Sequence, residues 1–132
     1  MSITNFEEIT EDLTEKELEY LADIQEGIIK ALSGPIPRKQ NELILLINNF
    51  LFEKHGLFVC VILKPVRLRK YVNYIRKNSL LPIMATSNGY FLSEDESMIE
   101  SQIKSLNERA KSIRDAAQGL QNYLNVKQLK TT

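Results

Sequence analysis

Hydrophobic residues recur every three or four positions through the first third of the chain, which predicts an amphipathic helix. Its start is marked by Thr14 and Glu17, the pattern of a capping box, in which each side chain binds the backbone amide of the other residue. The helix should run to about Leu32, where a Ser-Gly-Pro sequence ends it. Pro35–Pro37 then has room for one short edge strand at most. The apolar seam expected along this helix consists of Leu18, Leu21, Gln25, Ile28 and Leu32.

A second helix is predicted over Arg38–Lys54, where apolar residues are so frequent that little of the helix surface is left for water. This pattern is typical of a central core helix. His55 follows at the negative end of the helix dipole, so we interpret it as a C-terminal cap residue and not as a catalyst. Leu57–Leu63 is rich in β-branched and aromatic residues and is expected to be extended and buried, although periodicity does not separate a buried strand from a buried helical turn. Cys60 within it is expected to behave as a small hydrophobic residue.

A third helix is predicted over Pro65–Asn78, because proline suits the first turn of a helix. At 100° per residue its apolar residues fall on one side, and these are Leu68, Tyr71, Val72 and Ile75. The opposite side consists of Arg67, Lys70, Asn73, Tyr74 and Lys77, flanked by Arg69 and Arg76. This side contains no acidic residue, whereas ordinary exposed helix faces mix both signs of charge. The helix is therefore the strongest candidate for a surface that binds a polyanion.

Asn88-Gly89 lies between two short apolar runs, which predicts a β-hairpin over 81–92. A second capping box, Ser93 to Glu96, is expected to begin a helix that runs from about Glu94 to Leu124, roughly 45 Å. The apolar residues of this helix repeat every seven positions, which indicates lengthwise packing on another helix. This seam consists of Ile99, Ile103, Leu106, Ala110, Ile113, Ala117, Leu120 and Leu124.

Two kinds of partner fit the seam of the long helix. In a parallel homodimer Arg109 would face Arg114 of the partner subunit, which is unfavourable. An antiparallel pair instead sets Arg114 near Asn107 and Glu100 near Gln121, so an antiparallel homodimer is expected. The alternative is that the helix docks back onto the first helix of its own chain. In a combination of the two, the first half of the seam docks and its second half, from about Arg109, meets a partner.

The chain has 132 residues, 43% of them hydrophobic, which fits one domain of ordinary size with a real core. The expected divisions are an acidic arm over 1–12, a folded domain over 13–93, the long helix over 94–124 and a flexible tail over 125–132. A single cysteine excludes an internal disulfide and a cysteine-based zinc site, and no metal or cofactor is expected. The sequence has no apolar run of membrane-spanning length and no secretory signal pattern, so a cytoplasmic protein is expected.

Equal numbers of acidic and basic residues, 17 each, hide a strong asymmetry along the chain. Residues 1–29 contain nine acids and one base, whereas residues 30–80 contain ten bases and two acids. The remainder balances at six and six. Attraction to phosphate depends on local clustering more than on total charge, so the neutral total does not exclude a nucleic-acid partner.

Two helices that brace a third, basic helix beside a hairpin form a winged helix, in which the third helix enters the DNA major groove. Val66–Arg76, followed by Leu81–Ser93, resembles the small winged helix-turn-helix proteins of bacterial prophages and mobile elements. In that family a recognition helix of the pattern R-x-x-R-x-x-I-x-x-[IL]-R precedes [LI]-P-[IV]-x-[AS]-[TS]-x-x-G-Y and a long helix with S-L-x-x-R-A, which Ser105–Ala110 matches. The resemblance covers residues 57–124. It implies a mostly α fold with a small β-hairpin, a winged helix-turn-helix with a long C-terminal amphipathic helix. The apolar 57–63 and the hairpin turn without Lys or Arg depart from the family pattern.

We therefore expect the protein to bind double-stranded DNA without catalysis, as a transcriptional or replication accessory regulator. Arg67 and Lys70 suit guanine edges, and Asn73 suits adenine. The other expected contacts are Arg69, Arg76 and Lys77 on phosphates, Tyr74 on a phosphate or a thymine methyl, and Ser87 and Asn88 at the wing.

Other functions are weighed against DNA binding. A protein-interaction module on the same scaffold is favoured by the neutral total charge, the uncharged wing and the acidic N-terminal segment. An enzyme is disfavoured, because the five glycines form no phosphate loop and His55 and Cys60 lack a third group to orient them. A further hypothesis is that acidic residues between Glu7 and Glu26 compete with DNA for the basic helix, and the plainer interpretation is a solvated arm.

Overall fold

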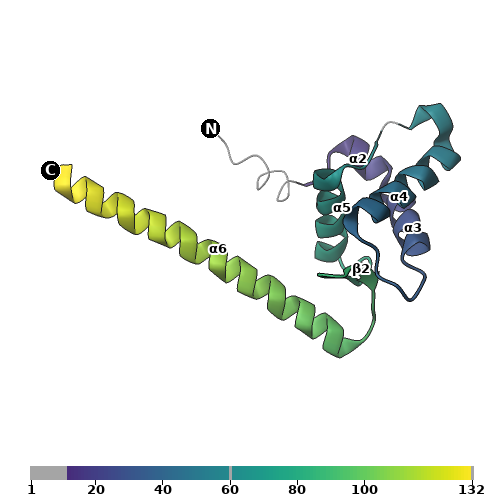
Figure 1. The fold of residues 1–132 in the computed structure, drawn as a ribbon. Helices are drawn as coiled ribbons and strands as arrows, with labels where there is room; N and C mark the ends of the chain where they lie inside the picture. The colour runs from purple at the N-terminus through teal and green to yellow at the C-terminus, as the bar shows by residue number, and fades with distance from the viewer. Residues whose placement is uncertain (1–11, 60, 132) are drawn as a thin grey trace. The chain divides into compact units, whose positions relative to one another are not determined.

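The computed structural model describes residues 12–59 and 61–131, which divide between two compact units, Met1–Glu94 and Asp95–Thr132. The described residues of the first unit, which we call the folded unit, form four helices, one 3₁₀ turn and one hairpin (Figure 1). In chain order these are α2 (Glu15–Glu19), α3 (Leu21–Ala31), α4 (Gln40–His55), η1 (Gly56–Phe58), α5 (Pro65–Lys77), β1 (Ile83–Thr86) and β2 (Gly89–Leu92). The second unit is the single helix α6 (Glu96–Thr131). The described residues are thus mostly helical with one small antiparallel sheet, as the sequence predicts.

The predicted first helix is two helices, because the backbone turns at Tyr20. The capping box is confirmed, since the Thr14 amide donates to the Glu17 carboxylate at 2.9 Å and the Glu17 amide donates to Thr14 Oγ1 at 3.2 Å. The Glu17 carbonyl then accepts the Tyr71 hydroxyl at 2.5 Å and the Tyr20 amide at 3.1 Å. Because the Tyr20 amide bonds three residues back instead of four, the chain tightens there and α3 starts in a new direction.

The break at Tyr20 also changes the predicted seam. Leu18 is 40% exposed, whereas Ile24 is fully buried beside Ile28. Gly27 faces α4, where a Cβ would lie 3.2 Å from the Phe50 ring, so its small size permits the close packing of α3 on α4.

Helix α4 is buried along one stripe only, through Leu43, Ile47 and Leu51. The prediction that almost its whole circumference is buried is therefore wrong. Leu45 and Phe52 are exposed, because α3 and α5 pack against one side of α4 and leave the other to solvent.

The segment 57–63 is predicted to be buried throughout, and for three of its residues this is wrong. Leu57 and Phe58 lie in η1 and are 92% and 84% exposed, and Ile62 is also exposed. Val61 and Leu63 are buried, as alternate residues of an extended backbone point to opposite sides. The Asn48 side chain fixes this segment through two hydrogen bonds to the Leu63 backbone, at 2.8 and 3.0 Å. Cys60 lies outside the described residues.

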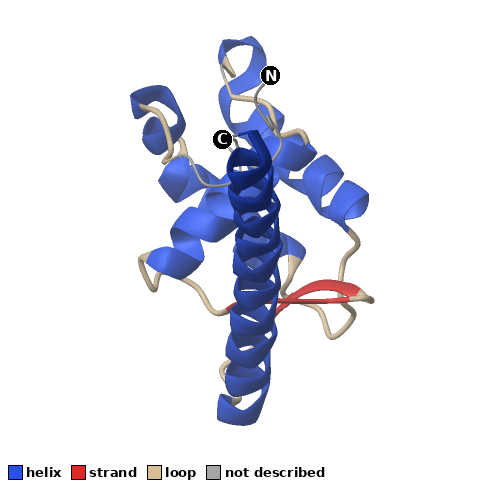
Figure 2. Ribbon diagram, turned by 90° about the vertical axis from the view of Figure 1, so that its left-hand side faces the viewer, coloured by secondary structure: helices blue, strands red, loops and turns tan. Residues whose placement is uncertain are grey.

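The hairpin pairs β1 with β2 in antiparallel register, from Ile83 opposite Leu92 to Thr86 opposite Gly89 (Figure 2). Arg38 adds an isolated bridge to Tyr90, one residue beyond the predicted edge strand at 35–37. The sheet edge thus gains a third segment from the connection between α3 and α4.

Helix α6 is 36 residues long, about 54 Å at 1.5 Å per residue. It begins two residues later than predicted, and the Asp95 carboxylate accepts the Ser97 amide at 3.4 Å. It continues through the residues predicted to form a flexible tail as far as Thr131. Thr132 and residues 1–11 of the expected acidic arm lie outside the described residues. Side-chain pairs four residues apart line it, such as Lys111 with Asp115 at 3.0 Å. In the described part of the chain, no helix is both long and apolar enough to cross a membrane.

Candidate nucleic-acid interface

Helix α5 is held by the apolar side that the sequence predicts. Leu68, Tyr71, Val72 and Ile75 are buried in the core of the folded unit. Pro65 occupies the first turn, and no residue between Pro65 and Lys77 is acidic. The helix therefore carries basic side chains on its remaining surface, and their local environment decides whether they are available to a ligand.

Glu17 of α2 neutralises two of these basic residues. Its carboxylate accepts Arg67 Nε at 2.9 Å and Lys70 Nζ at 2.8 Å. The Glu17 side chain is 5% exposed and that of Lys70 is 10% exposed. Burial raises the pKa of Glu17, but the hydrogen bonds from Lys70 and the Thr14 amide outweigh it, so the pKa lies below its ordinary value. Glu17 is thus a carboxylate held ionised between two cations.

The prediction that Lys70 lies on the exposed face is therefore wrong. Helical periodicity places Lys70 opposite the buried stripe, but α2 covers this flank of α5 and Glu17 supplies the counter-charge. Arg67 remains 41% exposed, yet its Nε is bonded to Glu17 and its Nη1 donates to the Ile62 carbonyl at 3.0 Å. Both side chains are thus held by groups of the folded unit.

The other predicted residues of α5 differ in their environments. Arg76 donates its Nε to the Ile83 carbonyl at 2.9 Å and so links α5 to β1. Lys77 pairs with Asp12 at 3.1 Å, and because both side chains are mostly exposed this pair is weak and easily exchanged. Asn73 is exposed, whereas Arg69 and Tyr74 are half-buried.

The hairpin turn brings in a basic residue that sequence reasoning missed. Ser87 and Asn88 are exposed at the turn, as expected, and the Asn88 amide donates to Thr86 Oγ1 at 3.2 Å. Lys39 donates its Nζ to the Ser87 carbonyl at 2.6 Å, so a cation lies beside a turn that has none in its own sequence. The two residues are 48 positions apart, and the Arg38 bridge to Tyr90 brings their segments together.

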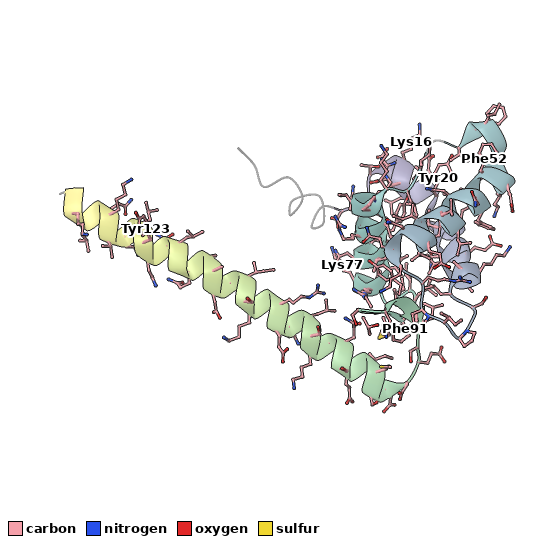
Figure 3. The ribbon with its side chains drawn as sticks, in the orientation of Figure 1. Lys16, Tyr20, Phe52, Lys77, Phe91 and Tyr123 are labelled. Atoms are coloured by element: carbon pink, nitrogen blue, oxygen red, sulfur yellow. The ribbon has the colours of Figure 1, made fainter. Side chains whose placement is uncertain are left out.

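An exposed apolar surface lies elsewhere on the folded unit, where α4 ends. It consists of Phe52, Leu57, Phe58 and Ile62 and borders an open hollow of about 360 Å³ also lined by Asn48, Asn49, Gly56 and Val59. We call it the η1 patch. In Figure 3, Phe52 and Lys77 lie on opposite sides of the folded unit as seen in that view. The patch and the exposed end of α5, which is the C-terminal end that carries Lys77, are therefore separate surfaces.

The base of the η1 patch is fixed by contacts to α3. His55 Nε2 lies 2.6 Å from Asp23 Oδ2, and Lys54 Nζ lies 2.7 Å from Asp23 Oδ1. The hydrogen bond from Lys54 is the main cause that lowers the pKa of Asp23. Tyr20 packs edge-on against the His55 ring and donates its hydroxyl to the Phe58 carbonyl at 3.3 Å. His55 is the last residue of α4, and Gly56 is the C-cap. The contact of His55 with Asp23 attaches the end of α4 to α3.

The seam of α6 is exposed along much of its length. Ile103, Ile113, Leu120 and Leu124 all leave about half or more of their surface to solvent. Leu106 and Ala110 are half-buried, and Ala117 is exposed. Tyr123 projects from the helix near its C-terminal end (Figure 3).

The described residues contain no group of His, Cys, Asp and Glu side chains arranged to hold a metal ion. Comparisons with family models, with curated proteins and with solved structures give no match for this chain.

Proposed function

We propose that the protein binds double-stranded DNA through the exposed end of α5 and the adjacent hairpin, in the manner of a winged helix, and acts as a non-enzymatic transcriptional or replication accessory regulator. The observation that carries this proposal is the acid-free α5 beside a hairpin whose edge is extended by Arg38. Helix, bridge segment, helix, basic helix and hairpin follow one another in the order that a winged helix requires.

The proposed contact set differs from the one that helical periodicity alone predicts. Asn73 is the candidate for reading a base edge, because it is exposed at the centre of the free stripe of α5. Lys77 and Arg69 flank Asn73 and suit phosphates. Lys39 supplies the cation of the wing beside Ser87 and Asn88. Lys70 is left out of the set because it is buried against Glu17.

A second copy of the chain is the partner that we propose for α6. The seam repeats every seven residues over five turns or more, and Ile103, Ile113, Leu120 and Leu124 within it are about half exposed or more. In an antiparallel pair, Arg114 lies near Asn107 of the partner subunit. In a parallel pair, Arg109 of each subunit would face Arg114 of the partner subunit, which brings like charges together twice. Charge therefore favours the antiparallel arrangement.

DNA binding is tested by fluorescence anisotropy with a labelled duplex and the full chain at low and moderate salt. Lys77→Glu should weaken binding at least tenfold, because it replaces a phosphate-binding cation by an anion. Lys30→Glu is the matched control, since Lys30 is exposed on α3 and the change in net charge is identical. Equal affinities of the two variants, or no binding by the wild type at micromolar concentration, would contradict the proposal.

A second candidate function, a protein-interaction module, is favoured by the η1 patch. Leu57 and Phe58 are adjacent, large, apolar and almost fully exposed, which is uncommon on a monomer without a partner. If this surface and not α5 carries the function, a Leu57→Ser/Phe58→Ser variant loses biological activity while Lys77→Glu retains it. The reverse pattern supports DNA binding.

A further inference from the structure

One carboxylate of α2, that of Glu17, is bound by two basic side chains of α5. Glu17 accepts three donors: the Thr14 amide at 2.9 Å, Arg67 Nε at 2.9 Å and Lys70 Nζ at 2.8 Å. Arginine and lysine are the side chains that proteins commonly direct to phosphate oxygens. The anion in this site belongs to a segment 50 or more residues away from its basic partners.

The surroundings of Glu17 explain why it stays in this position. The Tyr71 hydroxyl binds the Glu17 backbone carbonyl at 2.5 Å, so both the main chain and the side chain of this residue are attached to α5. Lys77 and Asp12 form a second, exposed link between the same two parts of the chain. Glu15 and Glu19, on either side in α2, are exposed and form no ion pair with any described residue. The contact is therefore specific to one of the three acids of α2.

We infer that Glu17 is an intramolecular competitor of the DNA backbone, which holds Arg67 and Lys70 in place of a phosphate and lowers the affinity of the protein for DNA. This inference rests on the proposed function of α5. Two cations that α5 could offer to DNA are neutralised at close range, so the wild type binds with fewer phosphate contacts than the charge of α5 predicts. Displacement of the Glu17 side chain would add Arg67 and Lys70 to the interface.

The test compares Glu17→Gln with Glu15→Gln and Glu19→Gln in the full chain. All three variants lose one negative charge from the same helix, and glutamine also functions in a capping box, so the helix start is kept. We expect Glu17→Gln to bind duplex DNA about tenfold more tightly than wild type at low salt. Its plot of log affinity against log salt should be steeper by about 1.8, because two further phosphates are contacted. The two control variants should change affinity less than twofold.

A second background separates competition from a general effect of charge. In a Lys70→Gln protein, the added Glu17→Gln change should raise affinity far less than it does in the wild type, because one of the two released cations is gone. Thermal unfolding of each variant checks that the folded unit is intact before its affinity is compared.

The outcomes distinguish the two proposals. If wild type and all variants fail to bind duplex DNA, the proposed function fails and this inference with it. If wild type binds but Glu17→Gln behaves as Glu15→Gln and Glu19→Gln do, DNA binding stands and Glu17 has a structural role alone. If Glu17→Gln gains affinity and the Lys70→Gln background removes the gain, Glu17 is the competitor.

Discussion

Arg38 and Tyr90 are joined by two main-chain hydrogen bonds, from the Arg38 amide at 2.9 Å and from the Tyr90 amide at 2.7 Å. Arg38 lies in the short connection between α3 and α4, and Tyr90 lies on β2, more than fifty residues later. This pairing attaches the hairpin to the helices. It also places Lys39 at the hairpin turn, so the charge of the proposed wing depends on it.

The first prediction concerns Gly89, at the start of β2. Its φ is 120°, and a Cβ at this position would lie 2.3 Å from the Arg38 carbonyl oxygen. Gly89→Ala should therefore separate the hairpin from Arg38 and destabilise the folded unit by about 3 kcal/mol. Chemical denaturation of the full chain measures this loss. Gly34→Ala is the control, because nothing lies within 4 Å of its Cβ position, and it should change stability by about 0.5 kcal/mol or less.

The second prediction concerns the hydroxyl of Tyr71. This group is buried and donates to the Glu17 carbonyl, and burial is the main cause that raises its pKa far above the ordinary value. Tyr71→Phe removes the donor and should cost about 1 kcal/mol of unfolding free energy. Tyr123→Phe, at a position on α6 where the side chain is mostly exposed, should have no measurable effect. A Tyr71→Phe protein as stable as the wild type would contradict a stabilising role for this hydrogen bond.

The third prediction concerns acid sensitivity. The pKa of Glu17 is lowered in the folded state, so its ionised form stabilises the protein above the ordinary value of 4.5, and this contribution is lost as the pH falls through the lower folded-state value. Asp23, also with a lowered pKa, acts in the same direction below its ordinary value of 3.8. Urea unfolding between pH 7 and pH 3 should show a smaller loss of stability for Glu17→Gln than for the wild type. Glu15→Gln should follow the wild-type curve, and a parallel decline in all three proteins contradicts the assignment.

The fourth prediction concerns the seam of α6. Ile113→Asp places a charge in the apolar stripe and should convert a dimer to a monomer, which sedimentation equilibrium measures directly. Ser112→Asp adds the same charge one position away, outside the seam, and should leave the mass unchanged. If the wild type is already a monomer, the proposed homodimer is wrong.

The orientation of the two α6 helices has its own test. With Cys60 replaced by serine, a Ser97→Cys variant should form no disulfide between subunits under mild oxidation, because an antiparallel pair holds these two positions about 45 Å apart. A parallel pair brings them together and cross-links readily. Rapid formation of a covalent dimer would therefore contradict the antiparallel arrangement.

Local patterns in the sequence were sufficient for several elements. The capping box of Thr14 and Glu17, the buried side of α5 and the Asn-Gly hairpin all depend on residues a few positions apart, so their spacing specifies them. The seven-residue repeat of α6 is equally local, and the length of the helix was underestimated only because its last turns lack the repeat.

Periodicity does not say which neighbour covers a given face, and the tertiary structure decided those points. Lys70 lies opposite the buried stripe of α5 by sequence, yet Glu17 and α2 cover it. Leu57 and Phe58 are apolar by sequence, yet no described element covers them. Lys39 has no sequence signal for its place beside Ser87. The amino-acid sequence thus determined the helices and the hairpin through contacts within a few residues, whereas the packing of distant segments determined which cations remain available to a ligand, because charge neutralisation requires atoms within a few ångströms in space.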